Sequence, residues 1–261
     1  MRDMPAPRQS PIAYHIGKTA EREKGMHEAA GSIIRPGRRR AGVLTLFGFV
    51  LLAAQPSHAA DTPDAAAGRT IAETGVLTGH VGCSACHLMN GAGQPDVGIP
   101  RLAGFSAAYL EQQLGYFATD KRRDSWMAPY ARMLTQKQMQ DVAAYYAGLS
   151  EPPPPEADPA SDGLRARGKE IFEKGVMANG VMPCGGCHGP AGQGMGTFAP
   201  HLAGQSAPYL LEQLRGWHQG KDRDPMGKMM ATEAHAMTDA DMQAVAAYLQ
   251  NLPGPNAGAA K

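Results

Sequence analysis

Two short stretches of the chain combine residue types and spacing that could do chemistry. Cys-Ser-Ala-Cys-His spans 83–87 and Cys-Gly-Gly-Cys-His spans 184–188, and together they use all four cysteines. Cys-x-x-Cys-His is the attachment signature of c-type haem. The two thiols can add to the two vinyl groups of a porphyrin, and the adjacent imidazole then lies beneath the iron as proximal ligand. We therefore expect two covalently bound haem c groups, attached by Cys83, Cys86, Cys184 and Cys187 and ligated by His87 and His188.

Other uses of paired cysteines fit the sequence less well. A redox-active dithiol is typical of a βαβ context, and the sequence shows no alternating apolar pattern long enough to predict a strand. A zinc site built from the two pairs would leave both motif histidines unexplained. A structural disulfide between cysteines three residues apart would close a very short loop and would explain the histidines no better.

The motifs sit in a duplicated sequence. Segments 68–75, 100–114 and 134–149 match segments 168–175, 200–214 and 237–252 in the same order and at nearly the same spacing. This predicts two tandem domains, 60–149 and 163–261, joined by a Pro-rich, acidic and semi-rigid linker at 150–162. Aromatic residues make up only 6% of the chain, so a large apolar cofactor would help to fill each small core.

The repeat also selects candidates for the sixth ligand of each iron among fifteen methionines. Met127 and Met230 both stand seven residues before the start of the last repeated segment, in what the sequence suggests are loops punctuated by Gly and Pro. Met133 is the alternative in the first domain, and Met226 and Met229 are alternatives in the second. Four histidines have no counterpart in the other repeat and are expected at the surface or beside the sites: His80, His201, His218 and His235.

Further residues are candidates for supporting roles. Pro100 and Pro200 follow the motif histidines by 13 and 12 residues, and their carbonyls are possible acceptors for the second imidazole N–H, although each is equally explained as a turn proline. The run Lys121–Asp124 is expected to be a solvated loop, with a docking patch as the alternative. Its partial recurrence at 221–224 leaves open that Arg123 and Arg223 face haem propionates.

Helices are predicted to hold these residues in place. The last helix of each repeat has a capping residue, Thr135 or Thr238, followed by apolar residues at helical spacing. Those apolar positions are Met139, Val142, Ala143 and Tyr146 in the first repeat and Met242, Val245, Ala246 and Leu249 in the second. A middle helix is expected over 106–117 and 206–217. The fold class is therefore all-α.

The N-terminal part of the sequence has the pattern of a targeting segment. Residues 1–59 are predicted to be an N-terminal extension and signal peptide, because Arg38–Arg40 precede a short apolar run at 41–54 and small residues precede an expected cut after Ala59. An uncleaved membrane anchor is the alternative, although the run is shorter than the roughly 20 residues of a spanning helix. Residues 60–261 carry 16 Lys and Arg against 20 Asp and Glu, a net charge of −4, which argues against nucleic acid as a partner.

Taken together, the haem motifs, the Leu-Ala-Gly turns at 102–104 and 202–204, the repeated methionine and the closing helix resemble dihaem cytochromes of the cytochrome c4 type. The resemblance implies two class I cytochrome c domains related by pseudo-two-fold symmetry, each with His/Met-ligated haem, in the bacterial periplasm. It implies one-electron transfer between respiratory or dehydrogenase donors and a terminal oxidase, with peripheral membrane association left open. One departure is Leu88, where the family usually has the glycine that is kept at Gly189.

The sequence leaves three alternatives to a free electron carrier. The chain could be the cytochrome subunit of a dehydrogenase complex of the flavocytochrome or alcohol dehydrogenase type. A dihaem enzyme, such as a peroxidase or thiosulfate dehydrogenase, would need an open or unusual sixth position. A Met-rich copper chaperone would leave the haem motifs unexplained. The expectation is an electron carrier that exchanges electrons with other redox proteins and is not itself an enzyme.

Overall fold

A computed structural model of the chain describes residues 62–77, 80–221 and 226–254. The expected signal peptide within 1–59 and the candidate Arg223 lie outside these residues. Among the residues described, no helix is both long enough and apolar enough to cross a membrane.

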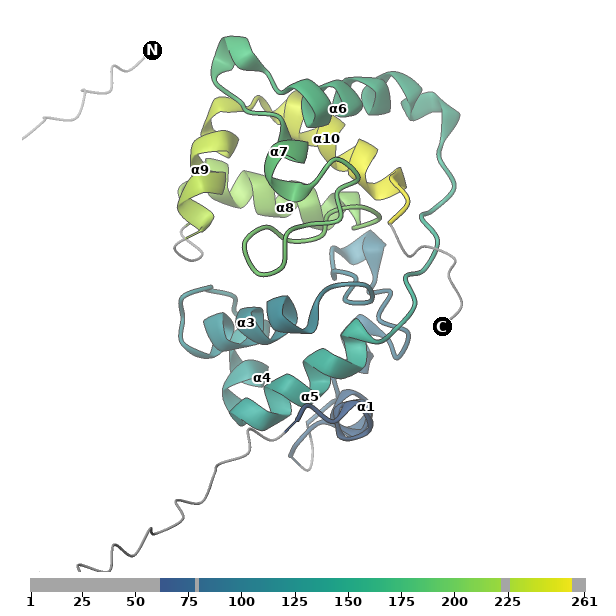
Figure 1. Cartoon of the computed structure of the whole chain (residues 1–261), viewed down its shortest axis with the longest axis vertical. Helices are drawn as coiled ribbons and strands as arrows, with labels where there is room; N and C mark the ends of the chain where they lie inside the picture. Colours follow the sequence, from purple (N-terminus) through teal and green to yellow (C-terminus); the bar gives the residue numbers. More distant parts are fainter. Residues whose placement is uncertain (1–61, 78–79, 222–225, 255–261) are drawn as a thin grey trace, which may run out of the picture. The chain divides into compact units, whose positions relative to one another are not determined.

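Within the described ranges, two sets of five α-helices follow one another (Figure 1). The first set is α1 (Ala65–Thr74), α2 (Ser84–His87), α3 (Ala107–Ala118), α4 (Met127–Met133) and α5 (Gln136–Ala147). The second set is α6 (Asp162–Lys174), α7 (Cys184–His188), α8 (Ala207–His218), α9 (Gly227–Ala236) and α10 (Asp239–Asn251). Over the described ranges the β pairing consists of isolated bridges, without a strand. The predicted all-α class is confirmed.

Local capping explains where the main helices start. The Ser106 side chain accepts a hydrogen bond from the Tyr109 N–H, so α3 begins one residue after it. Thr135 and Gln138 form a capping box at the start of α5, and the Thr238 hydroxyl accepts from the Asp241 N–H at the start of α10. These contacts satisfy N–H groups that have no partner within a helix. The predicted middle and last helices are thus confirmed to within a residue or so.

The apolar face of each last helix forms the core of its own domain. In α5 the four predicted positions are all buried, from Met139 at 6% exposed to Ala143 at 1%. Val142, Ala143 and Tyr146 lie in one cluster with residues of α1 and α3, including Ile71 and Leu110. The corresponding face of α10 packs with Ile171 and Phe172 of α6. Each domain therefore has a core that is built on its first and last helices.

A glycine allows these two helices to cross at close range in both domains. A Cβ at Gly68 of α1 would lie 1.9 Å from the backbone oxygen of Asp141 in α5. A Cβ at Gly168 of α6 would lie 2.0 Å from the backbone oxygen of Ala244 in α10. The close crossings of α1 with α5 and of α6 with α10 can be followed in Figure 1.

Two residues of the predicted linker take part in the folded structure. Its last residue, Asp162, already belongs to α6. Its second residue, Glu151, is not solvated like most of the segment, since it is only 3% exposed. A carboxylate that is buried in this way needs partners, and these partners are described below.

Candidate haem-binding sites

Each motif folds into a single helical turn that brings its reactive groups together. The Cys83 carbonyl accepts hydrogen bonds from the N–H groups of Cys86 and His87, and α7 gives the second motif the same helical form. Residues three and four apart share one face of a helix, so both thiols and the imidazole lie on the same side. Cys83 and Cys184 are half-buried, whereas Cys86 and Cys187 are exposed.

The histidine of each motif is buried and held by a proline carbonyl. His87 Nδ1 lies 3.0 Å from the Pro100 oxygen, and His188 Nδ1 lies 2.9 Å from the Pro200 oxygen. A carbonyl only accepts, so Nδ1 must carry the proton and donate it. In a neutral imidazole the lone pair then resides on Nε2, the atom that can bind a metal. The proposed acceptor role of both prolines is confirmed, in preference to a simple turn role.

Burial keeps these imidazoles in the form that binds iron. It lowers the pKa of His87 and of His188, against the opposing effect of the hydrogen bond to each proline carbonyl. Both rings are therefore neutral near pH 7. A ligating histidine has to be neutral, and its second nitrogen usually donates to a fixed acceptor that orients the ring.

Glycines bring each proline segment against the motif. The Gly93 N–H donates to the His87 carbonyl, and the Gly194 N–H donates to the His188 carbonyl. Both glycines have positive φ, and a Cβ at Gly93 would lie 2.5 Å from the Pro100 oxygen. A larger residue would push away the carbonyl that accepts from His87.

The more buried thiol of each motif has a pKa that does not suit a redox pair. All four cysteines are free of disulfides. Burial raises the pKa of Cys83, and it raises the pKa of Cys184 to about 11. A reactive dithiol needs a lowered thiol pKa, so these values argue against the redox alternative.

The two candidate methionines occupy equivalent helical positions, and the prediction that they lie in loops is wrong. Met127 is the first residue of α4, and Met230 lies in the first turn or so of α9. Each stands seven residues before the C-cap residue of its helix, Leu134 or Met237. The sequence suggested loops because Pro129 and Gly227 resemble helix breakers. Both fall near the start of a helix, where backbone N–H groups have no intrahelical acceptor and proline is tolerated.

Exposure separates the candidates in the second domain. Met230 is half-buried, whereas its neighbour Met229 is 49% exposed. Met229 corresponds to Trp126 in the first domain, which is 81% exposed. Met226, before α9, and Met133, at the end of α4, are half-buried but have no methionine counterpart in the other repeat.

The unmatched histidines are where the sequence placed them. His80, His218 and His235 are exposed. The His218 Nδ1 lies 2.8 Å from the Ala234 carbonyl, which is a structural contact. His201, by contrast, is only 6% exposed and directly follows Pro200, so it takes the other expected place, beside a site.

The basic run after α3 is a solvated loop except at Arg122. Lys121, Arg123 and Asp124 are exposed, as expected. Arg122 is only 8% exposed, lies over the Phe117 ring at 4.4 Å, and donates to the Gln113 side chain and to the Tyr209 hydroxyl. It therefore joins α3 to α8 and is not free for docking.

Sequence reasoning missed a group of buried polar residues beside the two sites. Arg101 is 3% exposed, Glu151 3% and Gln205 1%. The signals that were available are that Arg101 and His201 follow the two acceptor prolines directly, and that Glu151 opens the linker. Neither signal specifies burial, because burial depends on contacts between residues about 50 and 100 positions apart.

The described residues fit a covalently attached haem in each domain. Each site combines two thiols on one helical face, a neutral buried imidazole with its Nε2 lone pair free to ligate, and a half-buried methionine at a repeated position. These donors suit low-spin iron with one nitrogen and one sulfur ligand.

Comparison with known proteins also indicates two haem-binding domains. The family model for cytochrome c matches residues 65–150 and 165–253. The thiosulfate dehydrogenase electron acceptor of Thiomonas intermedia is 38% identical, over 84% of this chain and 93% of its own length. A cytochrome c4 of Pseudomonas aeruginosa is 34% identical, over 75% and 91% respectively.

Solved structures agree with this pattern. The reduced cytochrome c4 of Pseudomonas stutzeri superposes with a TM-score of 0.62 at 30% identity, covering 73% of this chain and 99% of that one. The thiosulfate dehydrogenase TsdBA of Marichromatium purpuratum superposes with a TM-score of 0.65 at 37% identity, covering 72% of this chain. This chain spans only 40% of that longer protein.

Proposed function

Since this chain belongs to the cytochrome c family, we propose that it takes electrons from a dehydrogenase and passes them to a terminal oxidase. Its relatives named cytochrome c4, and those named electron acceptors, make it a dihaem electron carrier with two covalent haem c groups, and not an enzyme. Its partners are accordingly redox proteins.

We further propose which residues hold the two haems. Cys83, Cys86, Cys184 and Cys187 form the thioether links, His87 and His188 are the proximal ligands, and Met127 and Met230 are the distal ligands. The main support is the equivalence of the two sites, since both histidines donate to a repeated proline carbonyl and both methionines share one helical position.

This ligand set accounts for the carrier function. When bound, the haems supply the one-electron couple between Fe(III) and Fe(II). With one histidine and one methionine as ligands, each iron would have no position left for a substrate, and thioether sulfur would favour Fe(II). The residues of the chain hold the imidazole orientation fixed and keep both rings neutral, so little has to rearrange when an electron arrives.

A test of the ligands compares two neighbouring methionines. Met230→Ala should remove half of the weak far-red absorption that Met–Fe(III) coordination produces, because one iron of two loses its sulfur. Met229→Ala is the matched control and should leave this band at full strength. The absorption spectrum of the oxidised protein, with a pyridine haemochrome assay to verify two haems per chain, measures both. Loss of the band in the Met229 variant alone would reverse the assignment.

The donor that the comparisons favour is a dehydrogenase of the thiosulfate-oxidising kind. Relatives over most of this chain are named electron acceptors of thiosulfate dehydrogenase, and TsdBA contains a segment of the same fold. A fixed subunit of a dehydrogenase complex is the second candidate, and it is favoured by that same longer chain. We also propose that the protein is exported to the periplasm, which the predicted signal peptide supports.

The donor is tested by mixing the oxidised protein with a thiosulfate dehydrogenase and thiosulfate. Both haems should become reduced at catalytic enzyme concentrations, and thiosulfate alone should reduce neither. Reduction by an alcohol dehydrogenase system but not by this pair would contradict the proposal. Co-purification of a second subunit from the native host would distinguish a fixed subunit from a free carrier. Mass spectrometry of the exported protein tests whether its chain begins after Ala59.

A further inference from the structure

Four buried polar side chains lie between the two haem-binding domains, within the single compact unit that contains them. We call Arg101, Glu151, His201 and Gln205 the interdomain cluster. Each is no more than 6% exposed. Burial of this much polar surface is unfavourable unless the groups satisfy one another, so the arrangement needs an explanation.

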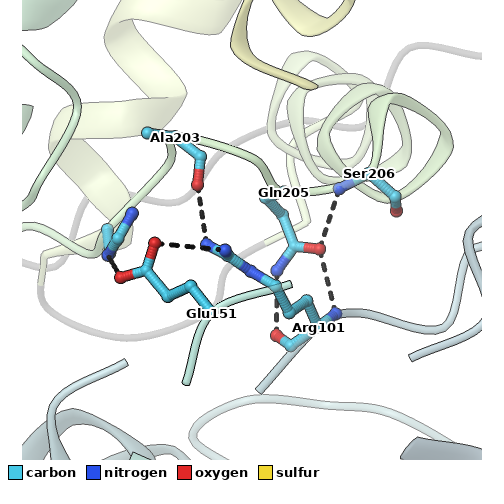
Figure 2. Close-up of polar contacts among 6 residues, drawn as sticks. Arg101, Glu151, Ala203, Gln205 and Ser206 are labelled. Carbon is cyan, nitrogen blue, oxygen red and sulfur yellow. Dashed lines mark hydrogen bonds and ion pairs between the residues drawn. The ribbon is translucent and has the colours of Figure 1, made fainter. Parts of the chain in front are cut away.

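The cluster fixes the main chain around Arg101 from the second domain (Figure 2). The Arg101 N–H donates to Gln205 Oε1, and Gln205 Nε2 donates to the Arg101 carbonyl, both at 3.0 Å. The Arg101 guanidinium donates to the Ala203 carbonyl at 2.6 Å. One residue of the first domain is therefore held at both backbone groups and at its side chain.

Glu151 is the carboxylate that these groups share. Its Oε2 lies 3.5 Å from Arg101 Nη1, and its Oε1 lies 3.7 Å from His201 Nδ1. The His201 ring also lies 5.8 Å from the Phe105 ring of the first domain. Glu151 thus contacts one residue from each repeat.

The two residues that Glu151 contacts are each bonded to a proline that accepts a hydrogen bond from a haem-motif histidine. Arg101 directly follows Pro100, whose carbonyl accepts from His87, and His201 directly follows Pro200, whose carbonyl accepts from His188. Arg101 and His201 are repeat counterparts, although one is arginine and the other histidine. A continuous path of peptide bonds and polar contacts therefore joins the two motif histidines through one carboxylate.

The residue that corresponds to Glu151 in the second repeat is a glycine, and it leaves room for the Glu151 carboxylate. Glu151 stands two residues after Leu149, as Gly254 stands two residues after Leu252. A Cβ at Gly254 would lie 1.7 Å from Glu151 Oε2. The second repeat has a glycine where the first has the carboxylate, so the asymmetry leaves space for a single shared anion.

We propose that Glu151 is a positioning residue for both haems, which sets the reduction potentials of both through Arg101 and His201 and the proline carbonyls that precede them. The proposal rests on ligation by His87 and His188 as proposed above. A firmly held carbonyl acceptor makes a proximal imidazole more basic and favours Fe(III). Release of both carbonyls should weaken both hydrogen bonds and favour Fe(II) at both haems.

Two variants of the full dihaem protein test this by different routes. Glu151→Gln removes the charge with little change of shape. Gly254→Ala keeps the charge but moves the carboxylate away from its place. Glu156→Gln, which changes an exposed residue of the same linker, is the control for loss of one negative charge.

The first measurement is a spectroelectrochemical titration of each haem. At a fixed potential, both test variants should raise the ratio of Fe(II) to Fe(III) about tenfold at both haems, which corresponds to about 59 mV for a one-electron couple. The control should leave both ratios unchanged. A change at neither haem, or at one haem only, would overturn the proposal.

The second measurement reports on the hydrogen bonds directly. In the reduced, diamagnetic protein, exchange of the His87 and His188 Nδ1 protons with deuterated solvent should be faster in both test variants, as followed by NMR. Variants that unfold more easily but keep wild-type exchange and potentials would show that the cluster only joins the domains. If Glu151→Gln does not mature with two haems, Gly254→Ala alone decides.

Spectra of the wild type distinguish a failure of the proposed haem ligands from a failure of the proposed role of Glu151. Absence of Met–Fe(III) absorption or of two ring N–H signals in the wild type would contradict the proposed ligands. Normal wild-type spectra with unshifted variants would contradict only the role of Glu151.

Discussion

At the scale of the residue, the position after each haem-motif histidine carries backbone strain in one domain and not in the other. Leu88 has φ 62° and ψ 157°, while its counterpart Gly189 has φ 79° and ψ 150°. A residue with a Cβ rarely adopts this conformation, at a cost of about 1–3 kcal/mol. The chain therefore tolerates at Leu88 a strain that glycine avoids at the equivalent place.

Replacement of Leu88 by glycine should stabilise the first domain. Relief of strain exceeds the loss of about 0.5–1 kcal/mol that glycine's extra freedom in the unfolded chain causes, so we expect a net gain of about 1 kcal/mol. Urea denaturation of the haem-loaded protein measures it. Gly189→Ala should destabilise, since its Cβ would also lie 2.5 Å from the Gln193 side chain. A loss of stability in Leu88→Gly would mean that side-chain packing outweighs the strain.

At the scale of the element, the crossing of first and last helices determines how each motif is presented. The crossing is close only because Gly68 and Gly168 lack a Cβ. The two glycines occupy equivalent positions in the repeat. The residues whose carbonyls they approach, Asp141 and Ala244, are equivalent as well. In each domain the haem motif forms the next α-helix after the first one, so a shift in the first helix would displace the motif.

Gly168→Ala should destabilise the second domain by about 3 kcal/mol, because overpacking forces α6 and α10 apart. Gly163→Ala in the same helix is the matched control. A Cβ there meets nothing within 4 Å, and alanine is the better helix former by up to about 1 kcal/mol. Thermal unfolding of both haem-loaded variants tests the contrast. Equal stability of the two variants would show that the helix pair adjusts at no cost.

At the scale of the whole molecule, the contact between the domains depends on a histidine that stays neutral. Burial and the nearby Arg101 guanidinium lower the pKa of His201 to about 4, although Glu151 is 3.7 Å away. In the unfolded chain the pKa of histidine is about 6.5. Between these values the unfolded chain binds a proton that the folded protein does not, so stability falls as the pH is lowered through this window.

Acidification from pH 6.5 to pH 4 should therefore remove roughly 3 kcal/mol of stability through His201 alone. The groups that face this ring are Arg101, Glu151 and the Phe105 ring. His201→Gln cannot titrate and should show a flatter dependence of unfolding free energy on pH. His80→Gln, at an exposed position, should keep the wild-type slope. Identical slopes for wild type and His201→Gln would contradict this account.

Much of the protein was determined by the sequence alone. The haem motifs, the repeat, the capped last helices and the proline acceptors each depend on short spacings or on helical periodicity, and such local patterns fix local structure. The helical form of α4 and α9 was missed, because proline and glycine near a helix start resemble breakers. By contrast, the folded protein is needed to see the burial of Arg101, Arg122, Glu151 and His201. A charged residue is buried when distant segments supply its partners, and no local pattern specifies those partners.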